Sequence, residues 1–215
     1  MKKIILLFVL IPFLSFAKFY KGTVTMNDDS IKNGFIELPE SPNDAKLKFR
    51  TEEKSSTEKL DIENVKGFEV SNEKNQTIKF ITFYLAKPKP FTNIEFKTDS
   101  KKSWVRIIKE GKISLYNTFE GYSSVISPSG GSMPGSGSGG ASYYIRKGTD
   151  NFAIFIDQVS GGATMCGNCF SQMKKIVSKI FEKDCPKLAD LIVKDDIKKN
   201  GYTRIIEIYE ENCGK

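Results

Sequence analysis

The spacing of apolar residues changes along this chain, and the change limits the folds that are open to it. From Lys18 to about Asp157, apolar and polar side chains alternate with a period of two, which is typical of strands with one wet face. After Gly162 the period becomes about 3.6, which indicates helices. The sequence therefore predicts an α+β fold, with an antiparallel β meander or barrel-like sheet followed by a helical segment.

Residues 18–160 are expected to form the β body, with nine or ten short strands joined by close turns. The run from Ile78 to Leu85 is apolar on both faces and is therefore expected to be a central strand. Lys87-Pro88-Lys89-Pro90 should end it, because proline has no N–H to donate to a sheet. We interpret this segment and Lys101-Lys102 as solvated turns.

One long insertion interrupts the β body. Residues 127–142 read SPSGGSMPGSGSGGAS, in which only Met133 and Ala141 are apolar. Such a segment buries too little apolar surface to offset the entropy lost on ordering. It predicts a disordered loop between two strands, and it lacks the Gly-Lys-Ser/Thr of a phosphate-binding loop.

Residues 161–215 are expected to form a tail of about three helices packed on the β body. The first carries an apolar face from Phe170 to Phe181, and a short second helix starts at Pro186, where proline is tolerated. Asn200-Gly201 breaks the chain before a third helix with apolar residues spaced from Tyr202 to Cys213. These apolar stripes predict core contacts with the sheet rather than a groove for a partner.

The N-terminus has the three-part layout of a secretory signal peptide over residues 1–17. Lys2 and Lys3 precede an apolar run, and Ser15-Phe16-Ala17 offers small residues for cleavage. The alternative is a retained membrane anchor, but the uninterrupted run from Ile4 to Ile11 is short beside the roughly 20 residues of a spanning helix. We therefore predict export to the periplasm, the cell surface or the medium, with no membrane span after cleavage.

The chain contains no histidine, which limits the catalytic and metal-binding sites that it can form. This absence excludes Ser-His-Asp and Cys-His nucleophiles and zinc bound through histidine. Removal of the signal peptide would lower the net charge from +7 to +5, and the remaining charges alternate in sign along the chain. We therefore expect no nucleic-acid partner, since such proteins gather basic residues on one face. A cofactor is not expected, and catalysis is less expected than binding, although a carboxylate hydrolase or a thiol enzyme stays open.

Three pairs of adjacent carboxylates are candidates for catalytic groups. Asp28-Asp29, Asp195-Asp196 and Glu210-Glu211 are neighbours in sequence, so their side chains tend to point apart. We interpret them as parts of a turn, a loop and a solvated helix end. A glycosidase would instead need two carboxylates that face each other across a cleft.

All four cysteines lie in the helical tail: Cys166, Cys169, Cys185 and Cys213. An even number in an exported chain suggests disulfides. Cys185 begins the second predicted helix and Cys213 lies near the end of the third. If these helices pack antiparallel, their outer ends meet, and the sequence therefore predicts a Cys185–Cys213 disulfide.

Cys166-Gly167-Asn168-Cys169 is the motif with the clearest chemical potential. A Cys-x-x-Cys pair at a helix N-terminus gains thiolate stabilisation from the helix dipole, as in redox couples. This segment alone resembles a thioredoxin-type active site, but helices follow it here where such enzymes need strands and a cis-proline loop. An inert local disulfide or loose thiols, a redox couple and a metal site remain the interpretations, although zinc would require all four thiolates.

Four segments together carry a wider resemblance. They are Gly22 to Asp29, Tyr143 to Gly148, Phe181 to Leu188 with its Asp-Cys-Pro, and Tyr209 to Cys213. In these motifs and in its layout, the chain resembles uncharacterised exported proteins of the Bacteroidetes type. The resemblance implies a signal peptide, a β-rich body and a helical tail, supports the Cys185–Cys213 pairing and implies no activity.

The sequence therefore supports two candidate functions. The first is a non-catalytic envelope or secreted protein that acts as a binding or structural module for an envelope protein, a glycan or the membrane periphery. The second is a thiol–disulfide redox protein that uses Cys166 and Cys169.

Overall fold

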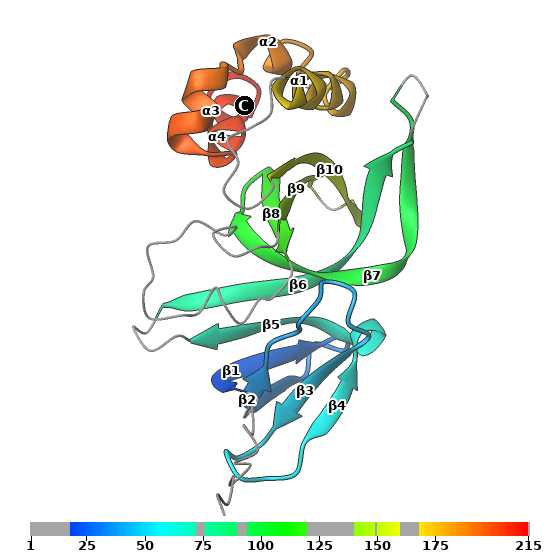
Figure 1. Ribbon diagram of the computed structural model, residues 1–215, viewed down its shortest axis with the longest axis vertical. Helices are drawn as coiled ribbons and strands as arrows, with labels where there is room; N and C mark the ends of the chain where they lie inside the picture. The colour runs from blue at the N-terminus through cyan, green and yellow to red at the C-terminus, as the bar shows by residue number, and fades with distance from the viewer. Residues whose placement is uncertain are drawn as a thin grey trace, which may run out of the picture.

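The computed structural model describes residues 18–71, 76–89, 94–119, 140–148, 150–159 and 168–214. The fold is α+β, as the sequence predicts, with a closed five-stranded barrel and a C-terminal group of four α-helices. In Figure 1 the helices lie at one end of the molecule, the barrel in the middle and the N-terminal strands at the other end.

Within the described residues, ten strands form one continuous sheet. They are β1 (Phe19–Met26), β2 (Ile31–Glu37), β3 (Lys46–Arg50), β4 (Glu58–Asp61), β5 (Val65–Ser71), β6 (Thr77–Pro88), β7 (Phe96–Lys109), β8 (Ile113–Phe119), β9 (Ala141–Lys147) and β10 (Phe152–Val159). Their spatial order is β10-β9-β8-β7-β6-β5-β1-β2-β3-β4. A short 3₁₀ helix, η1 (Ile62–Asn64), joins β4 to β5.

Strands β6 to β10 form the barrel. They make an antiparallel meander, and β10 then pairs with β6 in parallel through the pairs Phe152–Tyr84, Ala153–Leu85 and Ile154–Ala86. The closing pair is parallel because the first and last strands of a five-stranded meander run in the same direction. A buried cluster fills the barrel: Leu85, Val105, Tyr116, Tyr144 and Ala153.

Strands β1 to β5 form the N-terminal sheet, which continues from β6. Its alternating apolar residues bury one face, with Leu47 and Phe49 of β3 almost fully inaccessible to solvent. Phe68 of β5 stacks on Phe80 of β6 at 4.6 Å between ring centroids and meets Trp104 of β7 edge-on. β6 therefore belongs to both halves of the sheet, which confirms that the run from Ile78 to Leu85 is central.

Four helices cover the outer face of the barrel. They are α1 (Cys169–Ile180), α2 (Leu188–Leu191), α3 (Lys194–Asn200) and α4 (Thr203–Asn212). Met173 and Val177 of α1 and Ile205 of α4 are buried in one cluster with Leu115 of β8 and Ile156 of β10. The apolar stripes of the tail are thus core contacts with the sheet, as predicted.

The helical tail differs from the prediction by one helix. α3 was not expected, and Asp195 and Asp196 lie in its first turn rather than in a loop. Acidic side chains there favour the helix, since they face the positive end of its dipole. Gly201, with φ of 72°, ends α3 in a conformation that glycine adopts without strain.

Lys87, Pro88 and Lys101-Lys102 lie in strands rather than in turns. β6 continues to Pro88, which pairs with Phe96, so proline ends the strand slightly later than expected. Lys101 and Lys102 lie inside β7, a strand of 14 residues. An irregularity opposite Leu85 leaves the polar residues 99–101 exposed in the middle of the strand, so a polar stretch does not end it.

Several sequence predictions fall partly or wholly outside the described residues. These are the signal peptide at residues 1–17, most of the loop at 127–142, and Cys166. Ala141 and Ser142, which we assigned to the loop, are the first residues of β9. No helix in the described parts of the chain has the length and apolar character that crossing a membrane requires.

We expect Ala153→Leu to destabilise the protein, because Ala153 is fully buried inside the barrel where β10 meets β6. Overpacking of this kind costs about 1–3 kcal/mol. Urea unfolding monitored by circular dichroism should show a lower midpoint. Ala45→Leu at an exposed position is the control, and an equal effect of both variants would contradict barrel closure at Ala153.

Candidate functional site

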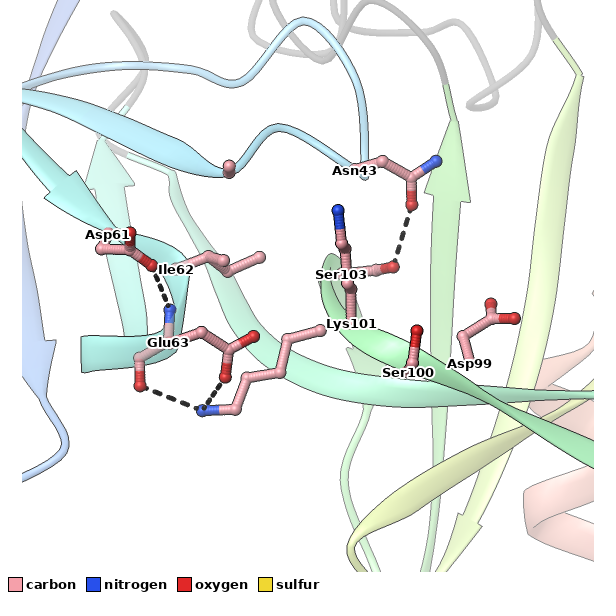
Figure 2. A pocket seen from close by; sticks show the side chains of 10 residues that line it. Asn43, Asp61, Ile62, Glu63, Asp99, Ser100, Lys101 and Ser103 are labelled. Atoms are coloured by element: carbon pink, nitrogen blue, oxygen red, sulfur yellow. Dashed lines mark hydrogen bonds and ion pairs between the residues drawn. The ribbon is translucent and has the colours of Figure 1, made fainter.

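A cavity of about 490 Å³ opens where the N-terminal sheet meets β7. We call it the junction cavity. Its lining residues come from the β2–β3 connection, from the end of β4 with η1, and from the middle of β7: Asn43, Ala45, Asp61, Ile62, Glu63, Asp99, Ser100, Lys101, Lys102 and Ser103. Asp61 and Ile62 lie on one side of it, and Lys101 and Ser103 lie on the other (Figure 2).

An irregularity in β7 forms one wall. Lys102 pairs with Tyr84 and Thr98 pairs with Ala86, so three residues of β7, 99–101, lie opposite Leu85 alone. A bulge of this kind bends the strand and redirects its side chains, and bulges are frequent beside functional sites. It places Asp99, Ser100 and Lys101 at the cavity.

The connection between β2 and β3 is anchored on β7 beside the bulge. The Trp104 backbone N–H donates to the Pro42 carbonyl, and its indole Nε1–H donates to the Asp44 carbonyl, both at 2.8 Å. Trp104 is completely buried, so these bonds are shielded from water. Between the two anchors, Asn43 Oδ1 accepts a hydrogen bond from Ser103 Oγ at 3.1 Å, as Figure 2 shows.

The opposite wall is the 3₁₀ turn. Asp61 caps it, because its Oδ1 accepts a hydrogen bond of 3.0 Å from the Glu63 backbone N–H. Lys102 crosses from β7 and donates to the Glu63 carbonyl oxygen at 3.4 Å, with the Glu63 carboxylate Oε2 at 3.9 Å. The turn and the bulge are thus connected by a charged side chain.

The charges around the cavity balance. Glu63 faces Lys102, and Asp99 lies 3.9 Å from Lys87 Nζ. Asp61 and Lys101 remain without an ion pair among the described residues. Ser103 donates to an amide, which cannot accept its proton as a base would, so the site offers hydrogen bonds rather than an activated nucleophile.

The structure contains the Cys185–Cys213 disulfide that the sequence predicts. Their Cα atoms are 5.8 Å apart, and Cys185 is buried at the end of the loop that follows α1. Cys213 caps the end of α4, so the bond ties the last helix to the start of α2. Cys169 is the first residue of α1 and is disulfide-bonded, whereas Cys166 lies outside the described residues.

A row of polar side chains lies beneath the helical tail. This row was not predicted from the sequence. Arg106, Asn117, Tyr143 and Asp157 are successive cross-strand neighbours on β7 to β10. Asn117 is fully buried, and its side-chain oxygen and nitrogen have no hydrogen-bond partner within the described residues. The signal available in the sequence was a polar residue beside apolar ones in two strands, Asn117 in β8 and Asp157 in β10.

The row fastens the tail through one buried hydrogen bond. Tyr202, which precedes α4, donates its hydroxyl to Asp157 Oδ2 at 2.7 Å, and its ring lies 4.3 Å from that of Tyr143. The Gln158 backbone N–H donates to Asp157 Oδ1 at 2.8 Å. Burial raises the pKa of Asp157, and burial together with the Asp157 carboxylate raises the pKa of Tyr202.

Comparison of the chain with models of protein families, with curated proteins and with solved structures found no match. Within the described residues, no three His, Cys, Asp or Glu side chains are grouped to hold a metal ion. The junction cavity was also missed from sequence, because its walls come from three segments that are far apart in the chain.

We expect removal of the disulfide to destabilise the protein by about 3.5 kcal/mol, since it closes a loop with a sequence separation of 28 residues. The double variant Cys185→Ala/Cys213→Ala should therefore unfold at lower urea concentration than the oxidised protein. The matched comparison is the Cys166→Ser/Cys169→Ser variant, in which reduction opens the Cys185–Cys213 bond alone and should lower the stability by the same amount. Unchanged stability in both would contradict a structural role for the bond.

Tyr202→Phe should cost about 1.5–3 kcal/mol, because it leaves a buried carboxylate with one fewer donor and keeps the aromatic ring against Tyr143. Urea unfolding measures the effect. Tyr209→Phe is the control, since Tyr209 lies in α4, the helix that follows Tyr202, and its ring packs on Phe181. A cost no larger than that of the control would show that the buried bond contributes nothing.

Asp157 should also give a pH-dependent stability. Its folded pKa is raised above the ordinary value of 3.8, so the folded state binds its proton more tightly than the unfolded chain does. The stabilisation is complete below about pH 3.8 and is lost as pH rises through the folded pKa. Asp157→Asn cannot titrate, so its stability relative to wild type should improve from about pH 4 to about pH 7. A constant difference across urea curves at these pH values would contradict the raised pKa.

Proposed function

We propose that this chain is an exported, non-catalytic protein that acts as a binding or structural module in the cell envelope or outside the cell. The Cys185–Cys213 disulfide carries the proposal, because such bonds persist in oxidising compartments and are rare in the cytosol. The secretory layout of residues 1–17 supports the same location. The periplasm, the cell surface and the medium are all locations that fit this proposal.

The shape of the site favours binding. The junction cavity combines an amide, hydroxyls, carboxylates and an ammonium group, held by a backbone that is anchored through Trp104. Pockets of roughly 300–1,000 Å³ with a few placed polar groups are typical of ligand sites. We propose a glycan, an envelope protein or the membrane periphery as the partner. We also propose that the chain belongs to a group of exported proteins of the Bacteroidetes type.

A thiol–disulfide function is the second candidate. Cys169 begins an α-helix of 12 residues and is only partly buried, and a helix N-terminus lowers the pKa of a thiol. A redox titration separates the two candidates. A reduction potential above about −250 mV, with a thiolate pKa below about 7.5, would favour redox function.

Export gives a direct prediction. Expression of the full chain in a bacterial host with a secretory pathway should yield a mature protein that begins at Lys18, outside the cytoplasm, with Cys185 and Cys213 bonded. Intact-mass measurement of each cell fraction tests this. The control replaces Leu6 and Leu7 by Arg, which should block processing because it interrupts the apolar run.

Two results would oppose the proposal. An uncleaved chain in the cytoplasm with free thiols would contradict export. Loss of the phenotype in the native host on Cys166→Ser/Cys169→Ser would favour redox function over the binding role. An unchanged phenotype would support the binding role.

A further inference from the structure

The geometry points to a neutral saccharide as the ligand of the junction cavity. This inference rests on the proposed function as an exported binding module and names the ligand class of that site. It starts from the kinds of atoms that the walls present.

The cavity places acceptors and donors on facing walls. Asp61 offers its carboxylate from the 3₁₀ turn, with Oδ1 already accepting from the Glu63 backbone N–H and Oδ2 available. Lys101 and Ser100 face it from the bulge, and Asn43 offers its amide N–H groups because its oxygen is held by Ser103. Each hydroxyl of a sugar both donates and accepts, so neighbouring hydroxyls match such a mixture of groups.

The charge balance selects a ligand without net charge. Three carboxylates line the cavity, and three lysines answer them when Lys87, which lies 3.9 Å from Asp99, is included with Lys101 and Lys102. A strongly anionic ligand would bring its charge toward Asp61 and Asp99, and a cationic ligand would bring its charge toward Lys101. Burial of an unmatched charge is costly, whereas a hydroxyl needs only a hydrogen-bond partner.

The walls also contain apolar atoms between the polar groups. Ile62 and Ala45 contribute to the lining beside Asp61. Sugar rings expose C–H faces between their hydroxyls, and such faces favour contact with apolar side-chain atoms. Over residues 99–103, which line the cavity, β7 pairs with β6 alone among the described residues, so a peptide that adds a strand at this edge is the competing ligand that the tripeptide probe tests.

The walls are held in place before any ligand arrives. The Trp104 bonds fix the β2–β3 connection, the Asp61 cap fixes η1, and Lys102 connects the turn to the bulge. A preorganised site loses less entropy on binding, so weak individual hydrogen bonds suffice for measurable affinity.

Saturation-transfer NMR and calorimetry on the mature protein, residues 18–215, test the inference. The probes are maltotriose and tri-N-acetylchitotriose as neutral saccharides, trigalacturonate as an anionic one, and a random tripeptide mixture. We expect at least one neutral probe to bind with a Kd of about 1 mM or tighter. Asp99→Asn and Lys101→Met should each weaken that binding by about tenfold, since each removes a charged hydrogen-bonding group.

The matched controls are Asp190→Asn and Lys175→Met, which make the same changes at exposed positions of the helical tail. They should bind the neutral probe as the wild type does. The inference is overturned if neither neutral probe binds, if trigalacturonate or the peptides bind more tightly, or if cavity and control variants behave alike.

Failure of the inference is distinguishable from failure of the proposed function. A processed, disulfide-bonded protein outside the cytoplasm that binds neither neutral probe overturns the saccharide site and leaves export intact. A chain that binds maltotriose but stays uncleaved in the cytoplasm does the opposite.

Discussion

The parallel pairing of β10 with β6 is the constraint on which the rest of this structure depends. Without the three residue pairs between Phe152–Ile154 and Tyr84–Ala86, β10 would be an open edge and its inner face would lose the barrel core. Closure also forces the remaining apolar side chains of β8 and β10 outward, where they need a cover. The helical tail covers these side chains with its own apolar faces. The change from a period of two to a period of 3.6 along the chain therefore corresponds to the change from the barrel to the helices that cover it.

The same closure accounts for the junction cavity. β7 must follow the curve of the barrel at one end and pass beside the N-terminal sheet at the other, over 14 residues. The bulge at residues 99–101 absorbs this change of direction, and Trp104 anchors the β2–β3 connection next to it. The polar side chains of the bulge cannot enter either apolar core, so they face the space between the two halves of the sheet.

The sequence predicted the type of fold because periodicity reports which faces are buried. It also gave the Cys185–Cys213 pairing, since two helix ends must meet when short helices pack antiparallel. It did not predict α3, whose seven residues contain one buried apolar side chain, Ile197, and therefore too little periodicity. Barrel closure, the cavity and the Asp157–Tyr202 bond were also missed, because each depends on contacts between distant segments.

The helical tail lies at one end of the molecule, beyond the barrel (Figure 1), and none of its residues lines the junction cavity, which has an energetic consequence. The tail is held by the disulfide and by the Tyr202–Asp157 bond, neither of which involves a residue that lines the cavity. Changes at separated sites with no shared partner usually add in free energy. The stability that the disulfide gives and the properties that the cavity residues set can therefore change independently of each other.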